Sequence, residues 1–251
     1  MEKKTIAISG GLGRIGLSLA IESAKNNFNV LIGDNNLKKY RLLKKKLDLL
    51  NIKFYKGNLC QSKDIDKFIK YGLRNFKKID YTVHCCYPKT KNWNEKFENL
   101  NQNTLNKNIS DHLGGSIIYS KKFIKYFLNK GDGKLIHISS IQGVAAPKFD
   151  HYKNLEMSSP IAYTAIKSGI IAITRYLAKY YGKKNIQINC ISPGGVKDNQ
   201  PMIFVERYKK SCLTKGLLDP EDLHSLIFFL LSDSSKLING QNIIIDDGWS
   251  L

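Results

Sequence analysis

The sequence predicts an α/β protein in which a parallel sheet carries helices on both faces. Short apolar runs rich in β-branched residues alternate with longer runs of helical periodicity, which is the pattern of successive βαβ units. A glycine cluster follows the first apolar run and comes before a helical run, as in sheets that bind nucleotides. The length of 251 residues suits a single domain spanning 1–251.

The expected elements follow one another in a regular order. Strands are predicted at 5–8, 30–32, 52–55, 81–85, 134–138, 186–191 and 242–245. Helices are predicted at 15–25, 37–50, 65–76, 116–128, 163–180 and 220–231. Two segments, 87–103 and 144–160, interrupt this rhythm. Because both follow strands, we expect them at the carboxyl edge of the sheet, where open α/β folds bind ligands.

Composition favours a soluble cytoplasmic protein. Hydrophobic residues make up 42% and charged residues 24% of the chain, and no apolar run approaches the length of a membrane span. The net charge of +19 comes mostly from lysines spread along the chain, so we expect attraction to an anionic substrate rather than binding to nucleic acid. The five cysteines lack CxxC spacing, which predicts free thiols and no metal site.

The glycine cluster reads ISGGLGRIG at positions 8–16. Gly10 and Gly11 would allow a tight turn, and Gly13 or Gly16 a close backbone approach to a dinucleotide pyrophosphate at a helix N-terminus. The alternative is a turn without a ligand.

Two charged residues bear on the choice between NAD and NADP. About 20 residues beyond the glycines, Asp34 can accept hydrogen bonds from the adenosine ribose and would repel a 2′-phosphate, which favours NAD. Arg14 favours NADP instead, because a guanidinium can pair with that phosphate. Asn58 follows the third strand, where it either bonds the adenine edge or serves as a turn residue beside Gly57.

The segment SPIAYTAIKSGI holds a candidate catalytic pair. Tyr163 and Lys167 are four residues apart, so a helix presents both on one face. A nearby ammonium and a positive nicotinamide ring would lower the pKa of the tyrosine and let it exchange a proton with a substrate oxygen. Ser139 and Ser140 end a predicted strand, where a hydroxyl can hold the same oxygen or simply form a turn.

Five segments in order give the chain a family resemblance over essentially its whole length. They are SGGLGRIG, the serine pair before Gly143, YTAIK, NCISPGGV and NGQNIIIDDG, and together they resemble the short-chain dehydrogenase/reductase family. The resemblance implies a Rossmann-type, doubly wound sheet of seven parallel strands, hydride transfer to or from a nicotinamide cofactor, and a homodimer or homotetramer. The resemblance implies that Tyr163 is the general acid/base, that Lys167 binds the nicotinamide ribose, and that Ser140 orients the substrate oxygen.

The resemblance also implies a set of cofactor-binding residues along five segments. Beside Tyr163 and Lys167, they are Ser9, Gly10, Gly11, Gly13, Arg14, Ile15, Gly16, Asp34, Asn58, Leu59, Cys85, Cys86, Pro193, Gly194 and Val196.

Three departures from the family pattern stand out. Residues 84–87 read HCCY where the family has NNAG, and Arg14 replaces the middle glycine of the usual TGxxxGxG. Alignment through Gly115 puts His112, rather than Asn108, where the family's catalytic asparagine sits. His112 is therefore either part of a proton relay to Lys167 through water or a packed histidine.

A narrower resemblance concerns the substrate. The segments HCCYPKTKNW and SPGGVKDNQPMIFVERY, with the insertion at 144–160, are similar to oxidoreductases associated with bacterial flagellin and surface-glycan modification, including legionaminic-acid-type clusters. This predicts a sugar or nucleotide-sugar substrate, contacted by Tyr152 in the insertion and by Asn199 in a lid at 197–217. The alternatives are an NADPH-dependent 3-oxoacyl-thioester reductase, a cofactor-binding scaffold without turnover, and nucleic-acid binding through charge alone.

Overall fold

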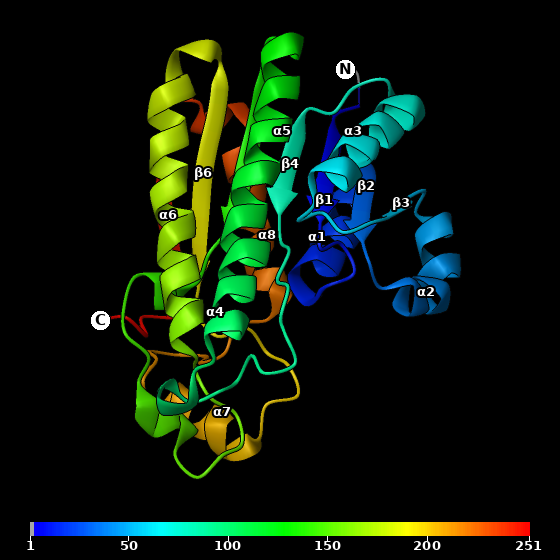
Figure 1. The fold of residues 1–251 in the computed structure, drawn as a ribbon. Coiled ribbons are helices and arrows are strands. Elements are labelled where there is room, and N and C mark those ends of the chain that lie inside the picture. Colours follow the sequence, from blue (N-terminus) through cyan, green and yellow to red (C-terminus); the bar gives the residue numbers. More distant parts are fainter. Residues whose placement is uncertain (1–2) are drawn as a thin grey trace.

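The computed structural model describes residues 3–251, and all seven expected strands form one parallel sheet (Figure 1). The strand order is β3-β2-β1-β4-β5-β6-β7. The strands are β1 (Thr5–Ser9), β2 (Asn29–Asp34), β3 (Lys53–Lys56), β4 (Tyr81–His84), β5 (Gly133–Ile138), β6 (Ile186–Pro193) and β7 (Asn242–Ile245). The predicted doubly wound, Rossmann-type arrangement is therefore confirmed.

Helices cover both faces of this sheet. The helices are α1 (Arg14–Lys25), α2 (Leu37–Leu49), α3 (Ser62–Phe76), α4 (Gln102–Asn108), α5 (Gly115–Lys130), α6 (Ile161–Tyr181), α7 (Met202–Lys209) and α8 (His224–Leu231), and of these α4 and α7 lie beyond the carboxyl ends of the strands (Figure 1). On one face, the buried apolar side chains of α1 and α8, such as Leu19 and Ile227, pack against β1 and β6. On the other, α3 and α5 contribute Phe68 and Phe123, which are completely buried. Removing these side chains from water supplies the main driving force that holds the layers together.

The strand order reverses between β1 and β4. From β1 the chain proceeds outward to β2 and β3, then returns to pair β4 on the other side of β1. The two strands end side by side, with Ser9 opposite His84 in the register. Such a reversal leaves a crevice beyond the carboxyl ends of the strands, and open α/β sheets bind ligands there.

Three segments differ from the elements expected from sequence. Residues 102–114, where no helix was expected, form α4 followed by a π-helical turn at Ile109–Gly114. The expected lid contains α7, because its apolar Phe204 packs into a small core beneath it. The helix expected from residue 220 begins with a 3₁₀ turn, Pro220–Leu223, capped reciprocally by Asp219 and Asp222. No helix within residues 3–251 has both the length and the apolarity needed to cross a membrane.

Candidate active site

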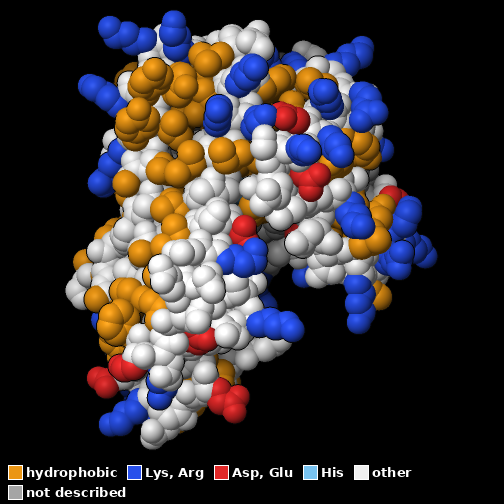
Figure 2. All heavy atoms as spheres, viewed as in Figure 1, with side chains coloured by type: hydrophobic (Ala, Val, Ile, Leu, Met, Phe, Trp, Pro, Cys, Tyr) orange, Lys and Arg blue, Asp and Glu red, His pale blue; other side chains and the backbone are white. Residues whose placement is uncertain are grey.

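A cavity of about 1320 Å³ lies beyond the carboxyl ends of the strands. One end is lined by the glycine loop and by Asp34, and the other by Ser140, Tyr163 and the segments that interrupt the βαβ rhythm. Figure 2 shows the surface hollowed between the part that carries α7 and the part that carries α2. A single cavity therefore joins the glycine loop and Asp34, predicted to bind the cofactor, to Ser140 and Tyr163, predicted to be catalytic.

The glycine loop is closely packed, which explains its composition. Gly10 has φ +63°, and a Cβ there would lie 2.8 Å from the carbonyl oxygen of Cys85. A Cβ on Gly16 would lie 2.3 Å from the carbonyl oxygen of Gly10. The backbone N–H of Gly13 donates to that same oxygen at 2.9 Å, and α1 begins at the next residue. Arg14, Ile15 and Gly16, the first residues of α1, line the cavity, so the helix N-terminus lies where it can bind a pyrophosphate.

Replacing Gly16 by alanine is expected to abolish NADH binding and to destabilise the protein. The new methyl group would overlap the backbone of Gly10, and a backbone atom in this closely packed loop cannot move aside as a flexible side chain could. Gly182→Ala is the matched control, because its Cβ would meet nothing closer than an Asn239 side-chain nitrogen at 3.9 Å. Fluorescence titration with NADH and thermal unfolding of both variants measure the two effects. Wild-type affinity in Gly16→Ala would contradict a close-packed phosphate loop.

Asp34 is held rigidly at the adenosine end of the cavity. One carboxylate oxygen accepts from the N–H of Leu12 at 3.0 Å, and the other accepts from the N–H of Asn36 at 2.9 Å. These two bonds fix the orientation of the carboxylate toward the cavity, which it lines. Asn58 and Leu59 line the same end, and the Asn58 side-chain oxygen accepts from the N–H of Cys60, so Asn58 does serve as a turn residue.

Three predicted cofactor residues at the ends of β1 and β4 have different surroundings. Cys85 and Cys86 line the cavity directly after β4. Ser9 lies behind the wall, where its hydroxyl pairs with Nδ1 of His84 at 2.7 Å and is completely buried. His84, the first residue of the HCCY departure, stacks on Tyr119 with ring centroids 4.2 Å apart. This histidine therefore supports the loop from inside rather than touching a ligand.

Tyr163 and Lys167 lie one turn apart on α6, as the spacing predicts. The ammonium Nζ of Lys167 is 5.5 Å from the centroid of the Tyr163 ring and donates to the carbonyl oxygen of Ile138 at 3.0 Å. The hydroxyl of Ser139 donates to the Lys167 carbonyl oxygen at 2.7 Å, which ties α6 to the end of β5. Tyr163 and Ser140 line the cavity, and Lys167 lies buried behind them.

Burial shifts the pKa of both members of the pair. It raises the pKa of Tyr163 to about 12, and a hydrogen bond with Ser140 opposes that rise. It lowers the pKa of Lys167 to about 8. Lys167 is therefore still mainly protonated at neutral pH, and its positive charge favours the phenolate form of the tyrosine.

His112 lies in the π-helical turn and is almost completely buried. Neither ring nitrogen has a hydrogen-bond partner among residues 3–251. Burial and the charge of Lys167 hold the pKa of this histidine well below its usual range. Asn108 has a structural contact instead, because its side-chain oxygen accepts from the N–H of Thr90 at 3.2 Å. An imidazole with two unpartnered nitrogens beside Lys167 has the chemistry to hold a water molecule.

The catalytic end of the cavity is rich in aromatic residues that the sequence analysis did not identify. The ring of Tyr87 lies 5.5 Å from Trp93, 5.4 Å from Tyr163 and 5.4 Å from His112. Trp249, near the carboxyl terminus, also lines the cavity and stacks on Tyr208. Tyr87 and Trp93 belong to the segment 87–103 that was expected at this edge of the sheet, whereas Trp249 comes from the far end of the chain.

The predicted substrate residues are separated by the structure. Tyr152 lines the cavity, and its hydroxyl accepts from the side-chain amide of Gln142 at 3.1 Å. Asn199 does not line the cavity, although the adjacent Asp198 and Gln200 do. Pro193, the last residue of β6, lines the cavity together with Gly194 and Val196.

The comparisons with known proteins agree with this geometry. A family model described as enoyl-(acyl carrier protein) reductase matches residues 12–250. The chain belongs to the short-chain dehydrogenase/reductase family. As a member of that family it is an oxidoreductase, and the resemblance inferred from the five sequence segments is confirmed.

Individual relatives cover the full length of the chain. It is 36% identical to post-translational flagellin modification protein A of Campylobacter coli, over 100% of both chains. It is 25% identical to 7alpha-hydroxysteroid dehydrogenase of Bacteroides fragilis, over 100% of this chain and 95% of the relative. Among solved structures, a short-chain dehydrogenase from Leptospira borgpetersenii with bound NAD+ has a TM-score of 0.85 and 27% identity, covering 100% of this chain and 94% of that one.

Proposed function

We propose that the protein is an NAD-dependent oxidoreductase that acts on a sugar or nucleotide sugar in bacterial surface-glycan biosynthesis. The observation that carries the NAD assignment is the fixed carboxylate of Asp34, held by two backbone N–H groups at the adenosine end of the cavity. A carboxylate in this place accepts hydrogen bonds from ribose hydroxyls and repels a 2′-phosphate. The Leptospira relative with bound NAD+ supports the same cofactor.

The reaction uses a proton-transfer centre at Tyr163. A bound nicotinamide supplies hydride chemistry at the substrate carbon. The Ser140 and Tyr163 hydroxyls line the cavity and hold the oxygen on that carbon, and Tyr163 donates or accepts its proton. Lys167 keeps the phenolate accessible through its charge and binds the nicotinamide ribose. His112 holds water behind Lys167, so that protons reach the buried pair.

The proposed sugar substrate is supported by the lining of the catalytic end. Tyr87, Trp93 and Trp249 line this end, and Tyr87, which is 42% exposed, offers an apolar ring to the carbon-bound hydrogens of a sugar. The side chains of Gln142 and Ser159 add hydrogen-bonding groups for hydroxyls. The flagellin modification relative points to the same class of substrate.

A 3-oxoacyl-thioester reductase is the second candidate. The description of the matching family model, a reductase of acyl-carrier-protein substrates, favours it. It would be expected to use NADPH, and Asp34 argues against that cofactor. A substrate panel that includes acetoacetyl-thioesters beside nucleotide sugars separates the two candidates.

The family resemblance also leads us to expect a homodimer or homotetramer in the cytoplasm. Figure 2 shows hydrophobic side chains gathered over the outer surface of α5 and α6. The exposed apolar residues of these two helices include Ile117, Tyr176 and Tyr180, which are 44%, 66% and 68% exposed. A surface of this kind supports association of subunits.

Replacing Asp34 by alanine is expected to erode a preference for NADH over NADPH. The wild-type carboxylate repels the 2′-phosphate and bonds the ribose, so the variant loses affinity for NADH and gains affinity for NADPH. Fluorescence titrations of both proteins with both cofactors measure the ratio. Tighter binding of NADPH by the wild type would overturn the NAD assignment, and binding of neither cofactor would favour a scaffold without turnover.

A further inference from the structure

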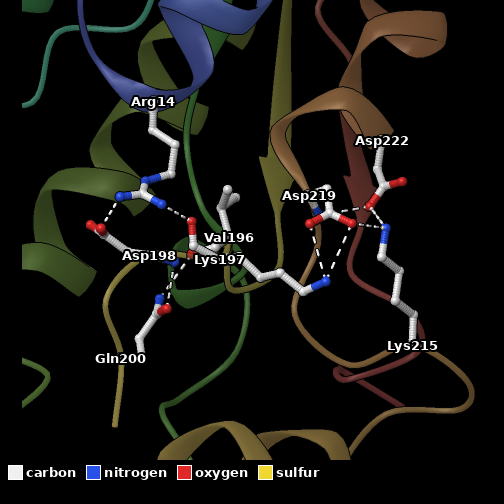
Figure 3. Close-up of polar contacts among 8 residues, drawn as sticks. All are labelled: Arg14, Val196, Lys197, Asp198, Gln200, Lys215, Asp219 and Asp222. Atoms are coloured by element: carbon white, nitrogen blue, oxygen red, sulfur yellow. Dashed lines mark hydrogen bonds and ion pairs between the residues drawn. The ribbon is translucent and has the colours of Figure 1, made fainter. Parts of the chain in front are cut away.

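Arg14 reaches from the start of α1 across the mouth of the cavity to the lid. Its guanidinium pairs with the carboxylate of Asp198 and also donates to the carbonyl oxygen of Lys197 (Figure 3). Positions 14 and 197 are 183 residues apart in sequence. One side chain of the glycine loop is therefore attached at two points to the first residues of the lid.

The beginning of the lid is held in place on its other sides as well. The N–H of Lys197 donates to Leu218 at 2.8 Å, and the Nζ of Lys197 is 3.1 Å from Asp219. The N–H of Asp198 donates to the side-chain oxygen of Gln200 at 2.5 Å, and the Gln200 amide donates to Val196 at 2.9 Å (Figure 3). These contacts fix the backbone at 197–198, so the Asp198 carboxylate is presented to Arg14 in a defined position.

This arrangement leaves Arg14 a role different from phosphate recognition. Both terminal nitrogens of its guanidinium contact the lid, Nη1 the Lys197 carbonyl oxygen and Nη2 the Asp198 carboxylate, and the fork of a guanidinium suits such a two-point contact. Asp198 lines the cavity, so its negative charge would repel the phosphates of a dinucleotide if it had no partner. Arg14 offsets that charge at the same time as it holds the loop.

We propose that Arg14 and Asp198 are positioning residues that fasten the lid to the glycine loop and so close the phosphate end of the cavity around the cofactor. Arg14 accordingly takes no part in recognising a 2′-phosphate. The inference rests on the proposed nicotinamide cofactor, but the contact itself consists only of residues of this chain.

Hydrogen–deuterium exchange without cofactor tests the contact directly. Arg14→Gln and Asp198→Asn should each speed amide exchange in peptides covering 197–209 by a factor of about two to five, and the double variant should match the single ones. The charge swap Arg14→Asp with Asp198→Arg should recover part of the protection. Asp48→Asn, which breaks the exposed Lys44–Asp48 pair on α2, is the control and should leave lid exchange unchanged. Unaltered exchange in Arg14→Gln and Asp198→Asn would overturn the proposal.

Cofactor titration of the same variants tests the consequence for binding. Arg14→Gln should weaken NADH and NADPH to a similar extent, about two- to fivefold, so that their ratio stays as in the wild type. Selective loss of NADPH affinity would make Arg14 a phosphate ligand and overturn the proposal. If the wild type binds neither cofactor, the proposed function fails, while the exchange experiment still decides whether the pair fastens the lid.

Discussion

Replacing Tyr163 by phenylalanine is expected to slow hydride transfer by about 10²–10⁴-fold, the usual contribution of a positioned proton donor. The hydroxyl lies at the cavity wall, and in the proposed reaction it exchanges a proton with the substrate oxygen. The phenyl ring keeps the contacts with Tyr87 and Trp93, so the fold and the NADH affinity should stay as in the wild type. NADH oxidation with a panel of keto sugars and nucleotide sugars measures the rate, and fluorescence titration measures the affinity.

Lys167→Met provides a contrasting variant. It removes the charge that favours the phenolate and the group proposed to bind the nicotinamide ribose, so both rate and NADH affinity should fall. It also leaves the Ile138 carbonyl oxygen without its 3.0 Å partner, so thermal unfolding must be measured beside it. A Tyr163→Phe protein with the wild-type rate would exclude Tyr163 as the acid/base. Loss of NADH binding in that variant would mean that the hydroxyl contributes to cofactor binding instead.

The sheet could be predicted from sequence because its signals are local. Each central strand is an apolar run rich in β-branched residues, since it is buried on both faces, and each helix shows one apolar stripe. The segment 102–114 escaped prediction, because α4 is short and mostly polar and is followed by a π-helical turn with a different spacing. Helix α7 likewise depends on its contacts with Tyr152 and other residues of the insertion, which no local pattern reveals.

The candidate site also contains residues that local sequence reveals and residues that only the folded structure reveals. Tyr163, Lys167 and Asp34 are recognisable because strand ends and helix spacing fix where their side chains lie. The partners of Arg14 are not recognisable, because Lys197 and Asp198 are more than 180 residues away in sequence and contact it only in the folded protein. The sequence left Arg14 as a potential phosphate ligand, and the structure shows its guanidinium engaged by the lid. Tyr87 and Trp93 lie in a segment that the sequence marks as unusual, but their place in the cavity was not predicted, since loop aromatics carry no periodic signal.

Mild acid is expected to destabilise the protein strongly. His84, His112 and His137 are all buried, and burial with the charge of Lys167 lowers the pKa of each, that of His137 to about 3. In the unfolded chain these histidines titrate near pH 6.5. Between that pH and the lower folded values, the unfolded chain binds protons that the folded protein excludes. The free energy of unfolding must therefore fall as the pH drops below 6.5, by about 1.4 kcal/mol per pH unit for each histidine.

Urea unfolding at a series of pH values from 7.5 down to about 5 measures this loss, in a range above the titration of ordinary carboxylates. Three histidines predict a total of about 4 kcal/mol per pH unit in the steepest part, which is a large share of the stability of a typical domain. His112→Asn should reduce the dependence of the unfolding free energy on pH by the contribution of one proton, about 1.4 kcal/mol per pH unit. The substitution deprives no neighbour of a hydrogen bond, because the ring nitrogens of His112 have no partner in the described chain. If the unfolding free energy of the wild type changed with pH by the contribution of one proton or less, these imidazoles would be accepting protons in the folded state. In that case water reaches the cluster around Lys167 freely, and a relay through His112 would have no advantage over direct exchange with solvent.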